Sequence, residues 1–274
     1  MEKSYFKGAS EPPLIEETIG TCFARVAANF PNREALVVRH QGIRWTWSQY
    51  RSEVINFATG LLALGIGPGD RVGIWAPNCY EWCLAQFATA KIGAILVCIN
   101  PAYRVFELEY ALTTSGCRAI IAAERFKSSL YLEMLQRLAP ELSSCEPGKL
   151  KSEKFPRLET VIRMGTQHTP GMYNLGDVCR MGSERELIRL DEIRRGLSCR
   201  DVINIQFTSG TTGNPKGAAL THYNILNNAN QVAAAMNFTE QDRLCIPVPM
   251  YHCFGMVLGK LACVTRGAAV TLRA

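Results

Sequence analysis

The sequence lacks paired cysteine motifs and long uninterrupted apolar runs. Its eleven cysteines are scattered singly, with no C-x-x-C pair, which excludes the common zinc-binding and dithiol redox motifs. Isolated cysteines in odd number are typical of reduced thiols in a cytoplasmic protein. The most apolar stretch, residues 244–264, contains Pro247, Pro249, His252 and Lys260, whereas a membrane-spanning helix needs about 20 mostly apolar residues. We therefore expect a buried interior segment here and no membrane span.

A secretory signal and a strong charge of one sign are also missing. Residues 1–13 have no apolar core of the kind that export signals need, so we expect a cytoplasmic location. The chain carries 30 basic and 24 acidic residues. The basic cluster from Lys149 to Arg157 contains Glu153 and no interleaved aromatic residues, so we interpret it as a solvated loop and expect no nucleic-acid partner.

Hydrophobic residues make up 47% of the 274 positions, enough for a large core, and their spacing alternates between two periods. Helical spacing predicts helices over residues 15–30, 47–64, 78–92, from 105 onward and 222–235, the second opened by a capping box at Thr46-x-x-Gln49. Short apolar runs predict strands at 35–38, 43–45, 71–76, 94–99, 118–122, 160–164, 202–207 and 268–272. Residues 142–156 and 165–182 have loop-like composition. Such alternation predicts an α/β fold with layered parallel sheets and helices on both faces.

The strongest local motif is residues 208–217, Thr-Ser-Gly-Thr-Thr-Gly-Asn-Pro-Lys-Gly, directly after a predicted strand. Its three glycines allow tight backbone bends that bring N–H groups to an anion, and its four hydroxyls add further donors. Lys216 supplies a positive charge for phosphate oxygens. The motif is not a Walker A loop, because Gly217 stands where that loop needs Ser or Thr. A phosphate-binding loop outside the P-loop class is therefore predicted.

The stretch from Ile205 to Gly217 resembles the AMP-binding signature of adenylate-forming enzymes at every position. The resemblance extends over nearly the whole chain and is greatest to the medium-chain fatty acyl-CoA synthetases. The other stretches that carry it are residues 46–50, 69–72, 100–103, 107–110, 221–224 and 249–255.

This resemblance implies a two-step, AMP-forming acid–thiol ligase. A carboxylic acid, here expected to be a fatty acid rather than an aromatic acid, attacks the α-phosphate of ATP and releases pyrophosphate; coenzyme A then displaces AMP. Mg²⁺ is expected to accompany ATP. By position in the motif, the residues implied to bind the phosphates are Thr208, Ser209, Gly210, Thr211, Thr212, Gly213 and Lys216.

The run Pro-Met-Tyr-His-Cys-Phe-Gly at residues 249–255 is similar to the acyl-pocket motif of the family. The resemblance implies that His252 acts at the reacting carboxylate or α-phosphate and that Phe254 lines the acyl pocket. Judged without the family, His252 would be interpreted as a hydrogen-bonded core residue. Cys253 suggests a Cys/His nucleophile, which we reject because neighbouring residues of one strand point to opposite faces. His222 is interpreted as a structural residue of a helix first turn.

Compared with the family pattern, the sequence ends inside the large N-terminal domain. We expect residues 1–274 to form an incomplete AMP-binding domain, with entry helices and a hairpin at 1–66, a first α/β lobe at 67–200, and the phosphate loop and the start of a second lobe at 201–274. The small C-terminal domain, its lysine and the magnesium ligands are expected to be absent, with no metal ligands in this chain, and the isolated chain to be inactive. The alternative is a non-catalytic homologue that binds nucleotide or a partner protein.

Overall fold

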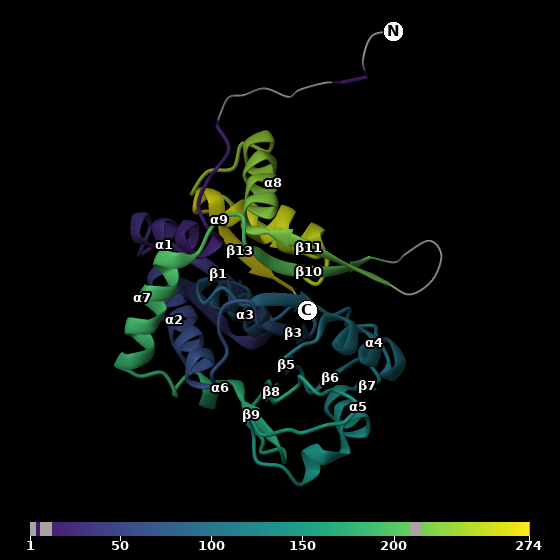
Figure 1. Ribbon diagram of the computed structural model, residues 1–274. Helices are drawn as coiled ribbons and strands as arrows, with labels where there is room; N and C mark the ends of the chain where they lie inside the picture. The colour runs from purple at the N-terminus through teal and green to yellow at the C-terminus, as the bar shows by residue number, and fades with distance from the viewer. Residues whose placement is uncertain (1–3, 6–12, 209–214, 274) are drawn as a thin grey trace.

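The computed structural model describes residues 4–5, 13–208 and 215–273, and within them two main β-sheets pack among helices (Figure 1). The strands are β1 (Glu34–Val38), β2 (Ile43–Thr46), β3 (Arg71–Trp75), β4 (Ile95–Cys98), β5 (Ala119–Ala122), β6 (Arg125–Phe126), β7 (Ser129–Leu130), β8 (Thr160–Arg163), β9 (Met172–Asn174), β10 (Val202–Thr208), β11 (Lys216–Thr221), β12 (Arg243–Ile246) and β13 (Ala269–Leu272).

The helices are α1 (Ile19–Asn29), α2 (Trp47–Ala63), α3 (Tyr80–Lys91), α4 (Val105–Ser115), α5 (Tyr131–Leu138), α6 (Leu175–Val178), α7 (Glu184–Gly196), α8 (His222–Ala235) and α9 (Ala262–Arg266). Two short 3₁₀ segments, η1 (Arg39–Gln41) and η2 (Pro140–Ser143), and a π-helix, η3 (Phe254–Leu261), complete the described elements.

The larger sheet has the strand order β11-β10-β4-β3-β5-β8-β9. All its neighbouring pairs are parallel except β10 and β11, which form an antiparallel hairpin. Its central strands are continuous apolar runs because both faces are covered. Leu96 and Cys98 of β4 face the core that contains α1, α2 and α3, whereas Val97 faces the core that contains α4 and α5. Helices therefore lie on both faces, which confirms the predicted α/β class (Figure 1).

The smaller sheet joins segments that are far apart in the sequence. Its order is β12-β13-β1-β2, with β1 parallel to β13 and antiparallel to β2. Each main sheet thus joins strands from both sides of residue 200. β1 pairs with β13, and β10, which follows residue 200, pairs with β4.

Several local predictions are confirmed and two need correction. Thr46 and Gln49 form the predicted capping box, with the Gln49 N–H donating to Thr46 Oγ1 at 3.3 Å. The first helix begins at Ile19 rather than at residue 15, because Thr18 caps it and accepts a bond from the Thr21 N–H at 3.2 Å. The expected loop 165–182 contains β9 and α6. Both elements are short, and the glycine and asparagine in this segment are typical of loops, so the sequence did not predict them.

The cysteines are separate thiols, and the most apolar stretch of the sequence divides into several elements. All eleven cysteines are free thiols, and six of them are buried. Within the described parts of the chain, no helix has the length and hydropathy that crossing a membrane would require. Residues 244–264 form β12, η3 and the start of α9, and most of their apolar side chains are packed in the core.

Candidate active site

The predicted phosphate loop follows the carboxyl end of a parallel strand. Gln206 of β10 lies opposite Cys98 of β4, so Thr208 and Asn100 leave the sheet at the same edge. Ligand sites of open α/β sheets form at this edge. The chain returns at Lys216, which pairs with Thr208 in the hairpin, and Thr208 Oγ1 donates to the Lys216 carbonyl at 3.4 Å. Both residues are exposed.

The remaining residues of the predicted loop lie outside the described residues. These are Ser209, Gly210, Thr211, Thr212 and Gly213. The structure therefore describes the two ends of the loop, Thr208 and Lys216, and shows that both stand at the carboxyl edge of the larger sheet.

His252 lies in the turn between β12 and η3, with an exposed side chain. Its Nδ1 accepts a hydrogen bond from the Phe254 backbone N–H at 3.1 Å. A neutral imidazole that accepts at Nδ1 carries its proton on Nε2. The ring can therefore donate a hydrogen bond from Nε2 to an anionic oxygen, which is the chemistry that a carboxylate or phosphate requires.

Cys253 does not point away from His252, so the reason for rejecting a Cys/His pair was wrong. The two residues lie at the turn that opens η3 rather than on a strand, and Cys253 Sγ is 3.8 Å from His252 Nδ1. Nδ1 already accepts the Phe254 N–H, so it has no free lone pair with which to take the thiol proton. His252 therefore cannot activate Cys253 as a nucleophile, and the reason is this occupied lone pair rather than the direction of the side chains.

Phe254 opens the π-helix and is 55% exposed. π-Helical turns occur often at functional sites. This helix, η3, contacts β10, the strand that precedes the predicted phosphate loop: Gln206 Nε2 donates to Met256 Sδ at 3.9 Å. The residues that carry the two predicted motifs thus belong to contacting elements.

A crevice of about 300 Å³ lies at this edge, between the ends of the two sheets. Its wall includes Asn78 after β3, Asn100 after β4, Phe126, Tyr251 and Arg273 after β13. An apolar wall with a few polar groups is typical of small-molecule sites. Of the acyl-motif residues, Pro249 and Tyr251 line this crevice, whereas His252 and Phe254 are not part of its wall.

Asn78 is a site residue that sequence reasoning missed. Its Nδ2 donates to the Val248 carbonyl at 2.9 Å, and its Oδ1 accepts from the Met250 N–H at 2.8 Å. These two bonds attach the segment before His252 to the end of β3. The Pro77-Asn78 pair directly after a buried strand was the only signal, and it did not indicate a partner.

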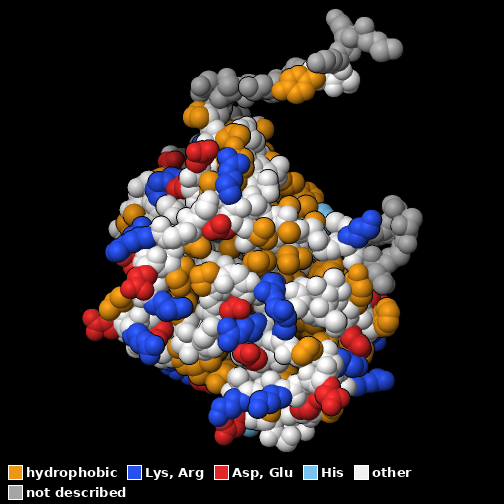
Figure 2. Space-filling view, viewed as in Figure 1, with side chains coloured by type: hydrophobic (Ala, Val, Ile, Leu, Met, Phe, Trp, Pro, Cys, Tyr) orange, Lys and Arg blue, Asp and Glu red, His pale blue; other side chains and the backbone are white. Residues whose placement is uncertain are grey.

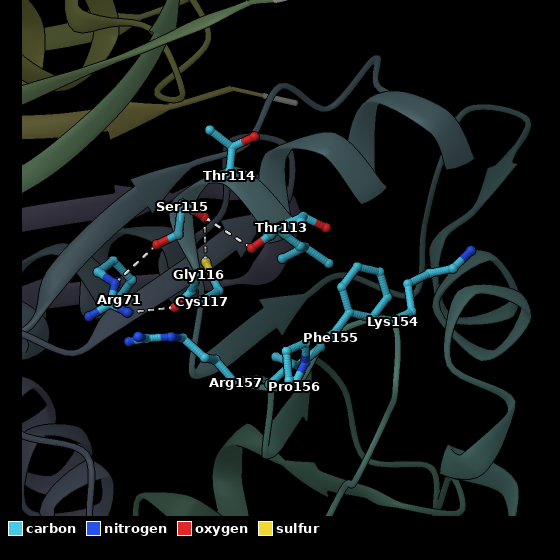
Figure 3. Close-up of a pocket in the computed structure, with 12 residues that line it drawn as sticks. Arg71, Thr113, Thr114, Ser115, Gly116, Cys117, Lys154, Phe155, Pro156 and Arg157 are labelled. Atoms are coloured by element: carbon cyan, nitrogen blue, oxygen red, sulfur yellow. Dashed lines mark hydrogen bonds between the residues drawn. The ribbon is translucent and has the colours of Figure 1, made fainter.

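A second hollow, of about 410 Å³, lies at the opposite edge of the sheet (Figure 3). Arg71, the first residue of β3, donates to the carbonyls of Ser115 at 3.0 Å and Gly116 at 2.8 Å. These carbonyls belong to the end of α4, where Gly116 is left-handed with φ of 59°. Arg71 therefore caps a helix, and we assign this hollow a structural role.

Charged side chains on the surface are interspersed, as Figure 2 shows for one face. In the basic cluster that the sequence placed in a solvated loop, Lys149 pairs with Glu146 at 2.5 Å and Lys154 pairs with Glu109 at 3.1 Å. In residues 4–5, 13–208 and 215–273, no group of three or more His, Cys, Asp or Glu side chains is arranged to hold a metal ion.

A family model, a curated relative and solved structures all match this chain, and they indicate the same family. The model of the AMP-binding enzyme family matches residues 23–274. Medium-chain acyl-CoA ligase ACSF2, mitochondrial, from Bos taurus is 45% identical over 98% of this chain, and the chain spans 44% of that relative. The anthranilate CoA ligase AuaEII in complex with anthranoyl-AMP has a TM-score of 0.79 at 22% identity, covering 97% of this chain and 46% of that one.

The N-terminal domain of FACL13 from Mycobacterium tuberculosis, solved with an inhibitor, has a TM-score of 0.75 at 25% identity. That match covers 94% of this chain and 57% of the FACL13 domain. Because the family model spans most of the chain and the fold agrees, the chain belongs to the AMP-binding enzyme family.

Proposed function

We propose that the protein is an ATP-dependent, AMP-forming acid–thiol ligase that converts a fatty acid to its acyl-CoA. The observation that carries this proposal is the 45% identity to a medium-chain acyl-CoA ligase over 98% of the chain. The chain spans less than half of that relative, so the activity is proposed for the longest polypeptide that its gene encodes.

The phosphate loop is proposed to hold ATP through Thr208, Lys216 and the residues between them, Ser209, Gly210, Thr211, Thr212 and Gly213. Donors and cations placed before the reaction lower the barrier most where negative charge develops. Lys216 supplies the cation beside the phosphates, and the hydroxyls and backbone N–H groups supply hydrogen bonds. His252 is proposed to donate from Nε2 to the reacting carboxylate or α-phosphate, supported by the bond that Nδ1 accepts.

The acid is proposed to be a fatty acid, with Phe254 against its chain. Coenzyme A is the proposed acceptor in the second step. Mg²⁺ is proposed to enter with ATP; the described residues provide no group of ligands for it, and we assign it no step. The proposed location is the cytoplasm, although the bovine relative is named as mitochondrial; microscopy of a C-terminally tagged protein tests this.

ATP–pyrophosphate exchange with octanoate tests the proposal directly, because it reports adenylate formation without coenzyme A. The longest polypeptide of the gene is assayed with octanoate, with benzoate and without acid, alongside the 274-residue chain. We expect exchange with octanoate to exceed exchange with benzoate. Exchange with benzoate alone would show an aromatic acid ligase. No exchange with either acid would indicate a homologue that binds nucleotide but does not form an acyl-adenylate.

His252→Ala and His222→Asn give a matched pair of histidine variants for this assay. His252 is exposed at the carboxyl edge, whereas His222 is buried. Loss of exchange in His252→Ala only, at unchanged ATP affinity, would support the proposed donor role. Equal losses in both variants would contradict it.

A further inference from the structure

A small internal cavity lies where α3, β10, α8 and η3 meet. Gln86 of α3, Asn204 of β10, Ile225 of α8 and Met256 of η3 all contribute to its wall. The space leaves about 10 Å³ in which the centre of a water molecule can lie. That is close to the room that one water needs, and too little for an organic ligand.

Two buried amides on this wall have polar atoms without a protein partner. Gln86 is 4% exposed and Asn204 is 2% exposed. In the described residues, Gln86 Oε1, Gln86 Nε2 and Asn204 Oδ1 have no hydrogen-bond partner. A buried polar atom left in this state costs about 1 to 3 kcal/mol, so three such atoms around one cavity call for a ligand.

The orientation of Asn204 is fixed by its other bonds. Its Nδ2 donates to the Leu96 carbonyl at 2.8 Å and approaches Cys98 Sγ at 3.3 Å. The amide oxygen is therefore the atom left for the cavity. Flipping the amide would place an oxygen against the Leu96 carbonyl, which the bond geometry disfavours.

We propose that this cavity is a hydration site that holds one water molecule. The water donates to Asn204 Oδ1 and Gln86 Oε1 and accepts from Gln86 Nε2. Three hydrogen bonds are the usual number for a buried water. The site links α3 to β10, the strand that ends at Thr208. It is independent of the proposed function, because it depends only on residues of the core.

A crystal structure of the unsubstituted 274-residue chain, at a resolution that shows ordered water, tests the site. We expect one density peak within about 2.6 to 3.2 Å of all three amide atoms. A direct hydrogen bond between Gln86 and Asn204 with no peak would overturn the proposal, and so would an empty cavity. This measurement needs no variant, so a folding defect caused by a substitution cannot affect it.

Oxygen-17 magnetic relaxation dispersion counts long-lived internal waters in solution and gives a second test. Gln86→Leu removes two of the three partners, so we expect it to lose one long-lived water. Thr89→Val is the matched control: Thr89 is equally buried on α3, and its hydroxyl donates to the Ala85 carbonyl at 2.7 Å rather than to the cavity. An unchanged count in Gln86→Leu, or an equal loss in Thr89→Val, would overturn the proposal.

Discussion

The two edges of the larger sheet use their polar side chains in opposite ways. At the amino edge, where the parallel strands begin, Arg71 donates to the carbonyls of Gly69, Ser115 and Gly116. His222, which follows Thr221 at the same edge, accepts the Ile19 N–H at 3.1 Å and is fully buried. At the carboxyl edge, Thr208, Lys216 and His252 are exposed.

This difference separates structural groups from candidate catalytic groups. The hollows at the two edges are similar in size, about 410 and 300 Å³, so size alone does not identify the active site. What separates the two edges is the state of particular side chains. Arg71 and His222 are bonded within the protein, whereas Lys216 and His252 are exposed. Changes at Arg71 and His222 should therefore alter stability, whereas changes at Lys216 and His252 should alter chemistry.

The largest effect is expected from Lys216→Ala at the carboxyl edge. Removing one charge-stabilising donor typically lowers the rate by about 100- to 1,000-fold, and we expect a loss of this size in ATP–pyrophosphate exchange by the longest polypeptide. Arg157→Ala is the control, because Arg157 is an exposed cation at the amino-edge hollow. Equal losses in the two variants would remove the distinction between the edges.

The next effect concerns acid stability at the amino edge. Burial lowers the pKa of His222 from 6.5 to about 4, against a smaller opposing effect of Asp201. Between these values the unfolded chain binds a proton that the folded chain does not, so stability is full above pH 6.5 and falls as the pH drops toward 4. Two and a half pKa units correspond to at most about 3 kcal/mol.

Urea unfolding between pH 7.5 and pH 4.5 measures this loss. His222→Asn should show a shallower decline than the unsubstituted chain. His40→Asn, at an exposed histidine, should leave the decline unchanged. Identical pH profiles for all three proteins would show that His222 does not govern acid stability.

Asn78 tests whether the carboxyl edge also has a structural support. Asn78→Ala removes both bonds to the segment before His252, and we expect a loss of about 2 kcal/mol in the free energy of unfolding. Exchange activity should fall as well, because the His252 turn is released. Asn56→Ala, at an exposed position on α2, should change stability by less than about 0.5 kcal/mol. A stable but inactive Asn78→Ala variant would instead place Asn78 at the substrate.

The smallest effect is expected from Arg71→Met, which keeps the apolar stem and removes the carbonyl bonds. Arg71 is half-buried, so we expect about 1 kcal/mol and a fall in Tm of about 2 to 4 °C for a chain of this size. Circular dichroism follows the melting, and calorimetry follows ATP binding. An altered ATP affinity would show that the amino edge is not purely structural.

Local elements could be predicted from the sequence, but their pairing could not. Apolar runs located β3, β4 and β5 closely because a buried parallel strand is continuous in hydropathy. Nothing local indicated that β10 would lie beside β4, or β1 beside β13, since register depends on contacts between distant segments. The order of strands in the sheets therefore differs from their order in the sequence.

The candidate site was predictable only where a motif marks it. The ends of the phosphate loop, Thr208 and Lys216, and the turn with His252 come from contiguous signatures. Asn78 could not be found in this way, because a single amide has no periodic signal and its partners lie far away in the sequence. The same holds for Gln86 and Asn204 at the hydration site in the core. Their roles depend on burial, which only the folded chain defines.

The pairing of β1 with β13 has a consequence for synthesis on the ribosome. The β1–β2 hairpin emerges early, but its parallel neighbour ends at Leu272, and translation adds roughly 5 to 20 residues per second. On the order of 10 to 50 seconds therefore pass between the emergence of Val38 and that of its partner. Through this interval the nascent chain presents an unpaired apolar strand edge, which is a site where other chains can pair and aggregate.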